Sequence, residues 1–461
     1  MKRFSLLIIF AATLTSSCNK YLDTPTPKTE VVDEFVFTSD VNATAAVTGL
    51  YISMNSLNYQ WANVMMNFLA GIHADDVYYA SAYEDYEVFR QARLRPNSTY
   101  VERFWNSLYS YVYTTNACIE GLSAATSLTP SLKDQLMGEA HFMRAYLYFY
   151  MVNMYGDVPL VLTTDYRTSQ QLPREKSELV YNQIVNDLKT AKQLLGDNYP
   201  NGNRVRPNKT VAAAMLARVY LYRHEWALAE SEANGVITNG NYALLKDLNK
   251  VFLANSQEAI FQLQTVNVAG GRNTWEAQVA IPANATAGPL FRLDTLNLIR
   301  KFETGDARLT NWTGNRTLTS GATYYWPAKY KVRIATPTQE YTMLLRVGEQ
   351  FLIRAEARIR QNKLDDGRSD LDSIRLRANL PKLNTSLTQP QLLLAVESER
   401  KFELFAEWGH RWFDLKRTQR STAVLGPIKG AEWQATDTLY PIPAYARSTN
   451  INLTQNDGYT N

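Results

Sequence analysis

The 461-residue sequence has few of the side chains on which many enzymes and metal sites depend. It contains two cysteines, Cys18 and Cys118, and four histidines. Cys18 directly follows an N-terminal apolar segment and is expected to be covalently modified, as argued below, so Cys118 would have no partner for an internal disulfide. The metalloprotease, serine hydrolase, Walker and dinucleotide-binding motifs are all absent from the sequence. We therefore expect a protein that is not an enzyme and that has no cofactor and no resident metal.

Charge of one sign and long apolar runs are also missing. Lys and Arg number 48 against 44 Asp and Glu, a net charge of +4, which gives no electrostatic case for binding nucleic acid. No run of about 18 apolar residues occurs, so the sequence predicts no membrane-spanning helix. Apolar residues at 45% and charged residues at 20% are typical of a folded globular chain.

The N-terminus has the pattern of an export signal. Lys2 and Arg3 precede the apolar stretch Phe4–Leu14, and small residues then lead to Cys18. We interpret residues 1–17 as a lipoprotein signal peptide, because the segment resembles the bacterial lipobox, whose cysteine is acylated. The alternative is a plain signal peptide with an incidental cysteine. Residues 18–38, rich in Pro and Thr, are then expected to form an extended tether behind the lipid anchor on Cys18.

Helical periodicity dominates the rest of the chain, and it is strongest over Met137–Val161. Ala140, Met143 and Leu147 follow one another at helical spacing, and aromatic residues occupy the opposite side. A helix that is apolar on nearly all sides is typical of the centre of a large helical assembly. Gly156 predicts its end. Further helices are predicted at Ser39–Leu57, Tyr100–Ala125 and Ser177–Leu195.

Two segments indicate tetratricopeptide-like helix pairs. In Thr210–Ile237, Leu216, Ala217 and Tyr220 precede a turn, and Ala229 follows at the spacing of that repeat. Phe351–Arg377 is a weaker copy. We therefore predict a mainly α fold, in which tetratricopeptide-like pairs support an irregular loop-rich subdomain with short β-strands.

The predicted division of the chain follows these patterns. An N-terminal helical part covers residues 39–241 and a C-terminal domain covers residues 242–461. Within the latter, residues 242–347 are an irregular insertion, residues 348–418 are helical, and the remainder is an extended tail.

One acidic and histidine cluster resembles a metal site in its spacing. Glu403, Glu407 and His410 would share one face of a predicted last helix, Leu393–Thr418, and Glu407 and His410 have the spacing of di-iron bundles. Such sites need a second copy on a partner helix, and no other histidine provides one. We favour a salt-bridged structural helix, with carboxylates paired to nearby arginines, namely Arg400, Arg411 and Arg417.

Aromatic residues make up 12% of the sequence, and several lie in irregular segments beside polar residues. A flat ring flanked by hydrogen-bonding groups suits the apolar face and polar rim of a sugar. The adjacent Asp75 and Asp76 favour a turn or capping role. Paired carboxylates that hydrolyse a glycan stay possible, because their separation is a three-dimensional property.

Several long motifs together resemble the SusD/RagB family of surface lipoproteins, nearly from end to end. They are Ser17–Asp23, Arg144–Tyr146, Tyr155–Leu160, Glu399–Leu404, Gly409–Arg417, Tyr440–Pro443 and Leu453–Tyr459, with Trp105, Tyr109 and Asn116 in an early helix. The resemblance implies helix pairs that support an irregular ligand-binding face. It also implies a partner, a TonB-dependent outer-membrane barrel of the SusC type, over which the lipoprotein acts as a lid facing the cell exterior.

The implied activity is capture of a nutrient glycan and its delivery to the transporter. The alternatives are a peptide ligand, as in RagB-like relatives, or a surface glycan hydrolase. Family ligand contacts come from variable loops, so we nominate residues by region. They are Asp75, Tyr78, Tyr79, Tyr83, Arg272, Trp275, Trp312, Tyr324 and Trp326.

Overall fold

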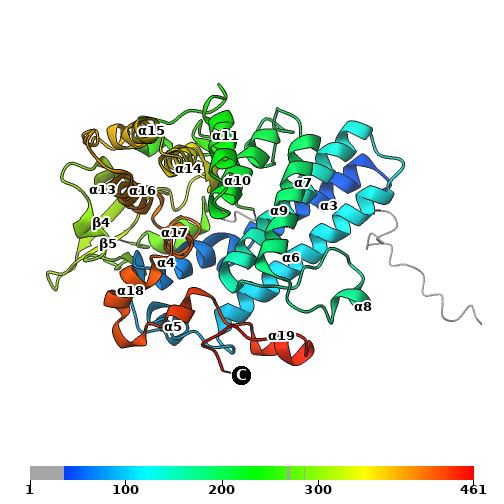
Figure 1. Cartoon of the computed structure of the whole chain (residues 1–461), viewed down its shortest axis with the longest axis horizontal. Helices are drawn as coiled ribbons and strands as arrows, with labels where there is room; N and C mark the ends of the chain where they lie inside the picture. Colours follow the sequence, from blue (N-terminus) through cyan, green and yellow to red (C-terminus); the bar gives the residue numbers. More distant parts are fainter. Residues whose placement is uncertain (1–35, 267–269, 285, 461) are drawn as a thin grey trace, which may run out of the picture.

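The computed structural model describes residues 36–266, 270–284 and 286–460. The predicted signal peptide, Cys18 and the tether up to residue 35 lie outside the described residues. Helices dominate the described part, and the strands are short and paired in twos (Figure 1). The predicted mainly α fold is confirmed.

Four long helices lie side by side at one end of the molecule (Figure 1). They are α3 (Asp40–Asn55), α6 (Thr99–Ala124), α7 (Pro130–Tyr155) and α9 (Ser177–Leu194). The side chains of residues 142–152 in α7 are all buried, as the apolar pattern predicted. Gly156 ends α7 at a φ of 72°, a conformation that glycine adopts without steric cost.

Two helix pairs form the predicted tetratricopeptide-like units. They are α10 (Lys209–Tyr222) with α11 (Trp226–Ile237), and α14 (Val347–Arg360) with α15 (Leu364–Arg377). The pairs stack because α11 packs against α14. A Cβ on Gly367 would lie 2.9 Å from the carbonyl oxygen of Ala355, so glycine at this position allows α15 to pack closely against α14. The boundary at residues 241/242 stays a prediction.

The region 242–347 contains most of the strands, as predicted. Each sheet is an antiparallel pair: β1 (Val77–Tyr79) with β3 (Phe291–Leu293), β2 (Ala259–Leu263) with β6 (Thr342–Arg346), and β4 (Thr313–Thr317) with β5 (Thr323–Pro327). Short helices accompany them, namely α12 (Trp275–Ala280), α13 (Ala307–Trp312), η3 (Leu248–Lys250) and η4 (Ile299–Lys301). The hairpin β4–β5 lies at the opposite end of the molecule from α3 and α6 (Figure 1).

The segment between α3 and α6 is more helical than expected. It contains η2 (Trp61–Leu69), α4 (Ala70–His73), β1 and α5 (Glu84–Arg90). Every residue of η2 is buried, including Trp61.

The prediction of one last helix over Leu393–Thr418 was wrong. The chain forms α16 (Gln389–Leu404) and α17 (His410–Arg417), separated by a bend in which Ala406, Trp408 and Gly409 have positive φ. Glu403 and His410 therefore belong to different helices. α18 (Ser421–Lys429) and η5 (Gly430–Glu432) follow.

The tail is tied to the centre of the molecule and is not wholly extended, because η6 (Ala435–Thr438) and α19 (Ala444–Thr449) interrupt it. The Tyr440 N–H donates to the carbonyl oxygen of Met154 at 2.8 Å, and the Asn456 amide donates to that of Tyr155 at 2.9 Å. The tail therefore fastens the end of α7. Within the described ranges, no helix is both long enough and apolar enough to span a membrane.

Candidate ligand-binding site

The two-stranded sheet β1–β3 lies at the candidate site, and its strand β1 lines the cavity there. Val77 pairs with Leu293 and Tyr78 pairs with Arg292. Val77 and Leu293 are buried, whereas Tyr78 and Arg292 are partly exposed. Because side chains alternate along a strand, the sheet buries one face in the core and presents a tyrosine and an arginine on the other.

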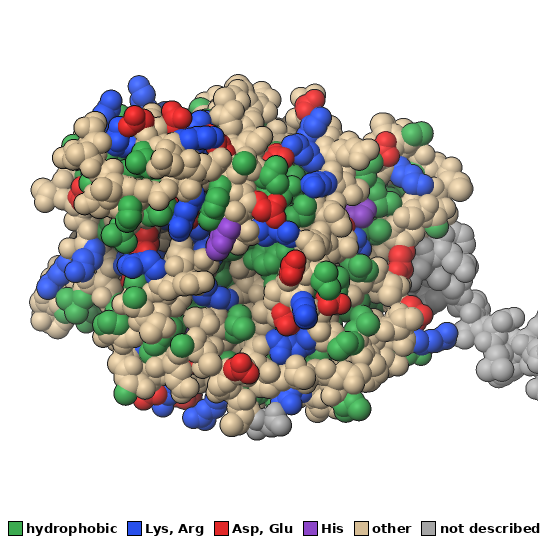
Figure 2. All heavy atoms as spheres, viewed as in Figure 1, with side chains coloured by type: hydrophobic (Ala, Val, Ile, Leu, Met, Phe, Trp, Pro, Cys, Tyr) green, Lys and Arg blue, Asp and Glu red, His purple; other side chains and the backbone are tan. Residues whose placement is uncertain are grey.

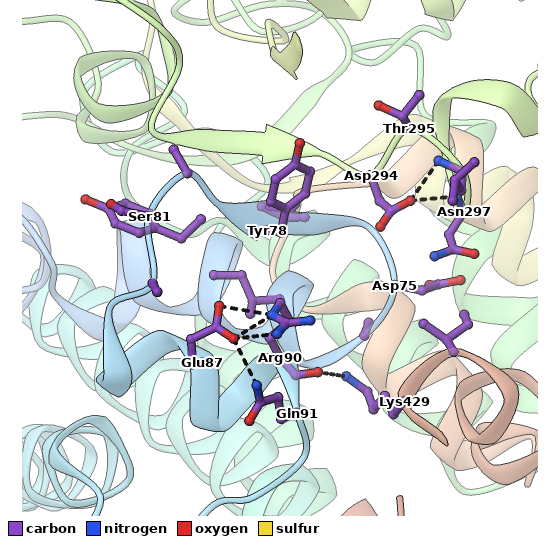
Figure 3. A pocket seen from close by; sticks show the side chains of 18 residues that line it. Asp75, Tyr78, Ser81, Glu87, Arg90, Gln91, Asp294, Thr295, Asn297 and Lys429 are labelled. Carbon is purple, nitrogen blue, oxygen red and sulfur yellow. Dashed lines mark hydrogen bonds and ion pairs between the residues drawn. The ribbon is translucent and has the colours of Figure 1, made fainter. Parts of the chain in front are cut away.

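A cavity of about 600 Å³ opens beside this sheet (Figure 3). Its walls come from β1 and the residues that follow it, from α5, from residues 294–297 after β3, and from the end of α18. Tyr78 and Tyr79 line it together with Asp75. The volume falls within the range of about 300–1,000 Å³ that is typical of small-ligand sites.

Hydrogen-bonding groups from α5, α18 and the loop after β3 surround the cavity (Figure 3). Glu87 accepts from Arg90, and the Lys429 ammonium donates to the Arg90 carbonyl oxygen at 2.8 Å. Burial lowers the pKa of Lys429 to about 8. The Asp294 carboxylate accepts from the backbone N–H groups of Leu296 and Asn297, and these two hydrogen bonds fix the loop after β3.

Asp75 is held in place by two cations. Its carboxylate accepts from Arg411 Nε at 2.9 Å and from Lys401 Nζ at 2.7 Å. Burial would raise the pKa of Asp75, but Arg411 and Lys401 outweigh that effect and lower it. The neighbouring Asp76 is 1% exposed, and burial, followed by the charge of Asp75, raises its pKa. Asp75 thus belongs to the wall of the cavity, whereas Asp76 is buried and does not line it.

A second aromatic group continues the surface away from the cavity. The Arg292 guanidinium lies 3.6 Å from the ring centroid of Tyr324 on β5, in cation–π contact. Tyr324 in turn faces Arg316 across the hairpin, and the Arg316 guanidinium lies 5.9 Å from the Trp326 ring. Tyr78, Arg292 and Tyr324 therefore form a partly exposed polar and aromatic surface, which we call the tyrosine–arginine surface.

The structure places the predicted ligand contacts in different environments. Asp75, Tyr78 and Tyr79 line the cavity, and Tyr324 joins them through Arg292. Tyr83 is exposed and packs its ring edge against Tyr86, with centroids 4.9 Å apart, but it does not line the cavity.

The expectation that Trp275 and Trp312 face a ligand is not met. Trp312 is 0% exposed and its indole N–H donates to the Leu248 carbonyl oxygen at 3.0 Å. Trp275 is 7% exposed, its N–H donates to the carbonyl oxygen of Asn55, and Arg272 lies 3.7 Å above its ring. These two rings fill the core of the irregular region, and Arg272 covers one of them.

Sequence reasoning missed Arg292, Arg90, Asp294 and Lys429. One signal was present: Arg292 stands between Phe291 and Leu293, an alternation typical of a half-buried strand.

The acidic cluster near the end of α16 forms ion pairs, as predicted, but with different partners. Glu403 accepts from Arg346 Nη1 at 2.5 Å, and Glu407 accepts from Arg346 Nε at 2.9 Å. Arg377 and Arg308 also pair with Glu403, and Lys329 also pairs with Glu407. The predicted Arg400, Arg411 and Arg417 bind other carboxylates. The described residues contain no group of three His, Cys, Asp or Glu arranged to hold a metal.

Two family models match long parts of the chain. One, described as starch-binding and associating with the outer membrane, matches residues 20–221, and the other, the SusD family, matches residues 303–459. A SusD-like protein P2 of Formosa agariphila is 25% identical over 515 residues, covering 100% of both chains. The starch-binding protein SusD of Bacteroides thetaiotaomicron is 26% identical over 432 residues, 74% of each chain.

Solved structures share the fold. A SusD superfamily protein from Bacteroides vulgatus has a TM-score of 0.80 at 21% identity, covering 91% of this chain and 99% of that one. The surface glycan-binding protein A from Bacteroides thetaiotaomicron, in complex with laminarihexaose, has a TM-score of 0.77 at 19% identity, covering 91% of this chain and 100% of that one. The architecture of stacked helix pairs with an irregular strand-containing region is therefore common to these proteins.

Proposed function

This chain belongs to the SusD/RagB family, and on that premise we propose that it binds a nutrient glycan at the cell surface and passes it to a transporter. The observation that carries the proposal is the 600 Å³ cavity with the tyrosine–arginine surface beside it. Tyrosine rings offer an apolar face to a sugar ring, and the arginine and the tyrosine hydroxyl groups offer hydrogen bonds to its hydroxyl groups.

We propose that the glycan is bound without being cleaved. Asp75 is engaged by two cations and Asp76 is almost inaccessible, so neither carboxylate is positioned to flank a glycosidic bond at the cavity. The relatives are named as binding proteins, which is consistent with this proposal.

A native-gel experiment tests the binding surface. The mature protein is run in gels that contain laminarin or starch, beside the double variant Tyr78→Ala/Tyr324→Ala and the control Tyr113→Ala. Tyr113 is 57% exposed on α6, away from the cavity, so its loss should not change mobility. We expect the glycan to retard the wild type and the control, and the double variant to migrate freely.

Two outcomes would contradict the proposal. Equal retardation of the double variant would remove the tyrosine–arginine surface from the site, and shortened oligosaccharides after incubation would show hydrolysis. Binding of peptides in place of all glycans tested would favour the peptide-binding alternative.

We further propose that the acylated Cys18 holds the protein on the outer membrane, where it acts as the lid of a SusC-like TonB-dependent barrel. Cys18→Ala should release the protein from membrane fractions, and wild type extracted in mild detergent should co-purify with the barrel. Retention of the variant in membrane fractions would contradict the lipid anchor on Cys18. Purification of the wild type without a barrel would contradict the role as a lid.

A further inference from the structure

A second cavity, of about 310 Å³, lies between α14, α16 and α17, and shares no lining residue with the candidate glycan site. Leu393 and Leu394 of α16 supply part of an apolar wall. Leu394 is 51% exposed, so the mouth of the cavity is open to solvent. A mostly apolar cavity with a few convergent polar groups is the usual form of a small-ligand site.

One buried polar group that lines this cavity, Arg400, is incompletely bonded. Arg400 is 2% exposed, and its Nε donates to Asp414 Oδ2 at 2.7 Å. Its Nη1 and Nη2 have no hydrogen-bond partner among the residues described. A buried charged donor without a partner is costly, because folding removes its water and returns nothing. Arg400 therefore has two buried donors without an acceptor in the described part of the chain.

The charges that line the cavity leave one positive charge in excess. Four arginines (Arg360, Arg400, Arg417 and Arg420) face three carboxylates (Glu356, Glu397 and Asp414). The carboxylates are already engaged: Asp414 accepts from both Arg400 and Arg417, Glu356 accepts from Arg417 through both oxygens, and Glu397 accepts from Arg420. An entering anion would therefore meet unopposed positive charge.

We propose that this cavity binds a small amphipathic carboxylate. The carboxylate accepts from the free guanidinium nitrogens of Arg400, whose planar fork matches two oxygen atoms, and the aliphatic part packs on Leu393 and Leu394. A strongly hydrated inorganic anion would leave the apolar wall uncovered, and a neutral ligand would leave Arg400 unsatisfied.

Calorimetry on the full mature protein tests this with hexanoate and its neutral analogue hexanamide. We expect hexanoate to bind and hexanamide to bind at least about tenfold more weakly, since the charge-assisted hydrogen bonds are lost. Leu394→Asp, which places a negative charge at the mouth, should weaken hexanoate binding by about tenfold or more. The control Leu376→Asp, a 53% exposed leucine on α15, should leave it unchanged.

Arg400→Gln should abolish hexanoate binding. If that variant does not fold, the comparison of Leu394→Asp with Leu376→Asp tests the proposal instead. Absence of hexanoate binding to the wild type, equal affinity for hexanamide, or equal affinity of the Leu394 and Leu376 variants would each overturn the proposal. Retardation by glycan is measured on the same samples and should be unaffected, so a failure here is distinct from a failure of the glycan-binding proposal.

Discussion

At the scale of single residues, the C-terminal half is organised by charges buried against one another. Arg346 contacts Glu258, Glu403 and Glu407, and all four side chains are at least nine-tenths buried. Arginine suits this position because its planar fork can serve several carboxylate oxygens at once. Desolvation offsets much of the attraction in such a network, so its net contribution is small while every partner is present.

Removing Arg346 should nevertheless be costly, because it would leave buried carboxylates without compensation. We expect Arg346→Met to lower the free energy of unfolding in urea by about 3–5 kcal/mol. The control is Lys250→Met, whose partner Asp247 is 3.9 Å away in an exposed pair. That change should cost about 1 kcal/mol or less. Equal losses in the two variants would contradict the importance of the network.

Glu276 gives the stability of the protein a dependence on pH. It is 2% exposed and accepts from the Asn67 amide at 2.8 Å and from the Thr342 hydroxyl at 3.0 Å. Burial raises its pKa from 4.5 to about 7. Between these two values the folded state holds a proton that the unfolded state has lost, so this residue's contribution to stability falls as the pH rises through the window.

Glu276→Gln should therefore flatten the dependence of the unfolding free energy on pH between about 5 and 7. At pH 8 the variant should be more stable than the wild type by on the order of 1 kcal/mol or more. Exposed Glu84→Gln serves as the control and should preserve the wild-type slope. Urea unfolding at several pH values measures both, and parallel curves for Glu276→Gln and wild type would refute the assignment.

At the scale of elements, periodic helices could be predicted from the sequence closely. The predicted Ser177–Leu195 is α9, Ser177–Leu194, and the turn predicted between Tyr220 and Ala229 separates α10 from α11. These boundaries follow from local patterns and turn residues.

The bend between α16 and α17 could not be predicted, because distant contacts hold it. The Trp408 N–H donates to Asn67 Oδ1 at 2.6 Å and its indole N–H donates to the Met343 carbonyl oxygen at 2.5 Å. Neither partner is near in the sequence, and the apolar spacing runs straight through the bend.

Gly409 in this bend should not tolerate a side chain. It has a φ of 67°, and a Cβ there would lie 2.9 Å from the Cβ of Ala70. We expect Gly409→Ala to destabilise the protein by roughly 1–3 kcal/mol.

Gly235 in α11 is the matched control, because a Cβ there meets nothing within 4 Å. Gly235→Ala should stabilise the helix by about 0.5–1 kcal/mol. Thermal unfolding of the two alanine variants should therefore move in opposite directions, and a neutral Gly409→Ala would show that the bend is not strained against substitution.

At the scale of the whole molecule, a near-neutral chain forms a surface of mixed charge. Figure 2 shows Lys and Arg side chains interspersed with Asp and Glu on the visible face. On this face no extended area of one sign is visible, in keeping with the net charge of +4. The proposed recognition of a glycan rests on local shape and chemistry at the cavity and not on an overall charge.

The candidate site could be predicted only in part. The tyrosines around Tyr78 pointed to the cavity, whereas Arg292 is placed beside Tyr78 by the pairing of β1 with β3, which joins distant segments. Trp275 and Trp312 were misassigned because a tryptophan in an irregular segment can bury its ring and satisfy its N–H with a backbone carbonyl.

The central claim is that a glycan is held, uncleaved, against the tyrosine–arginine surface. The most direct test is a crystal structure of the mature protein with the oligosaccharide derived from whichever glycan retards it in native gels. The account predicts an intact oligosaccharide with sugar rings packed on Tyr78 or Tyr324 at the cavity. Density for the sugar on another face, or for a cleaved product, would contradict it.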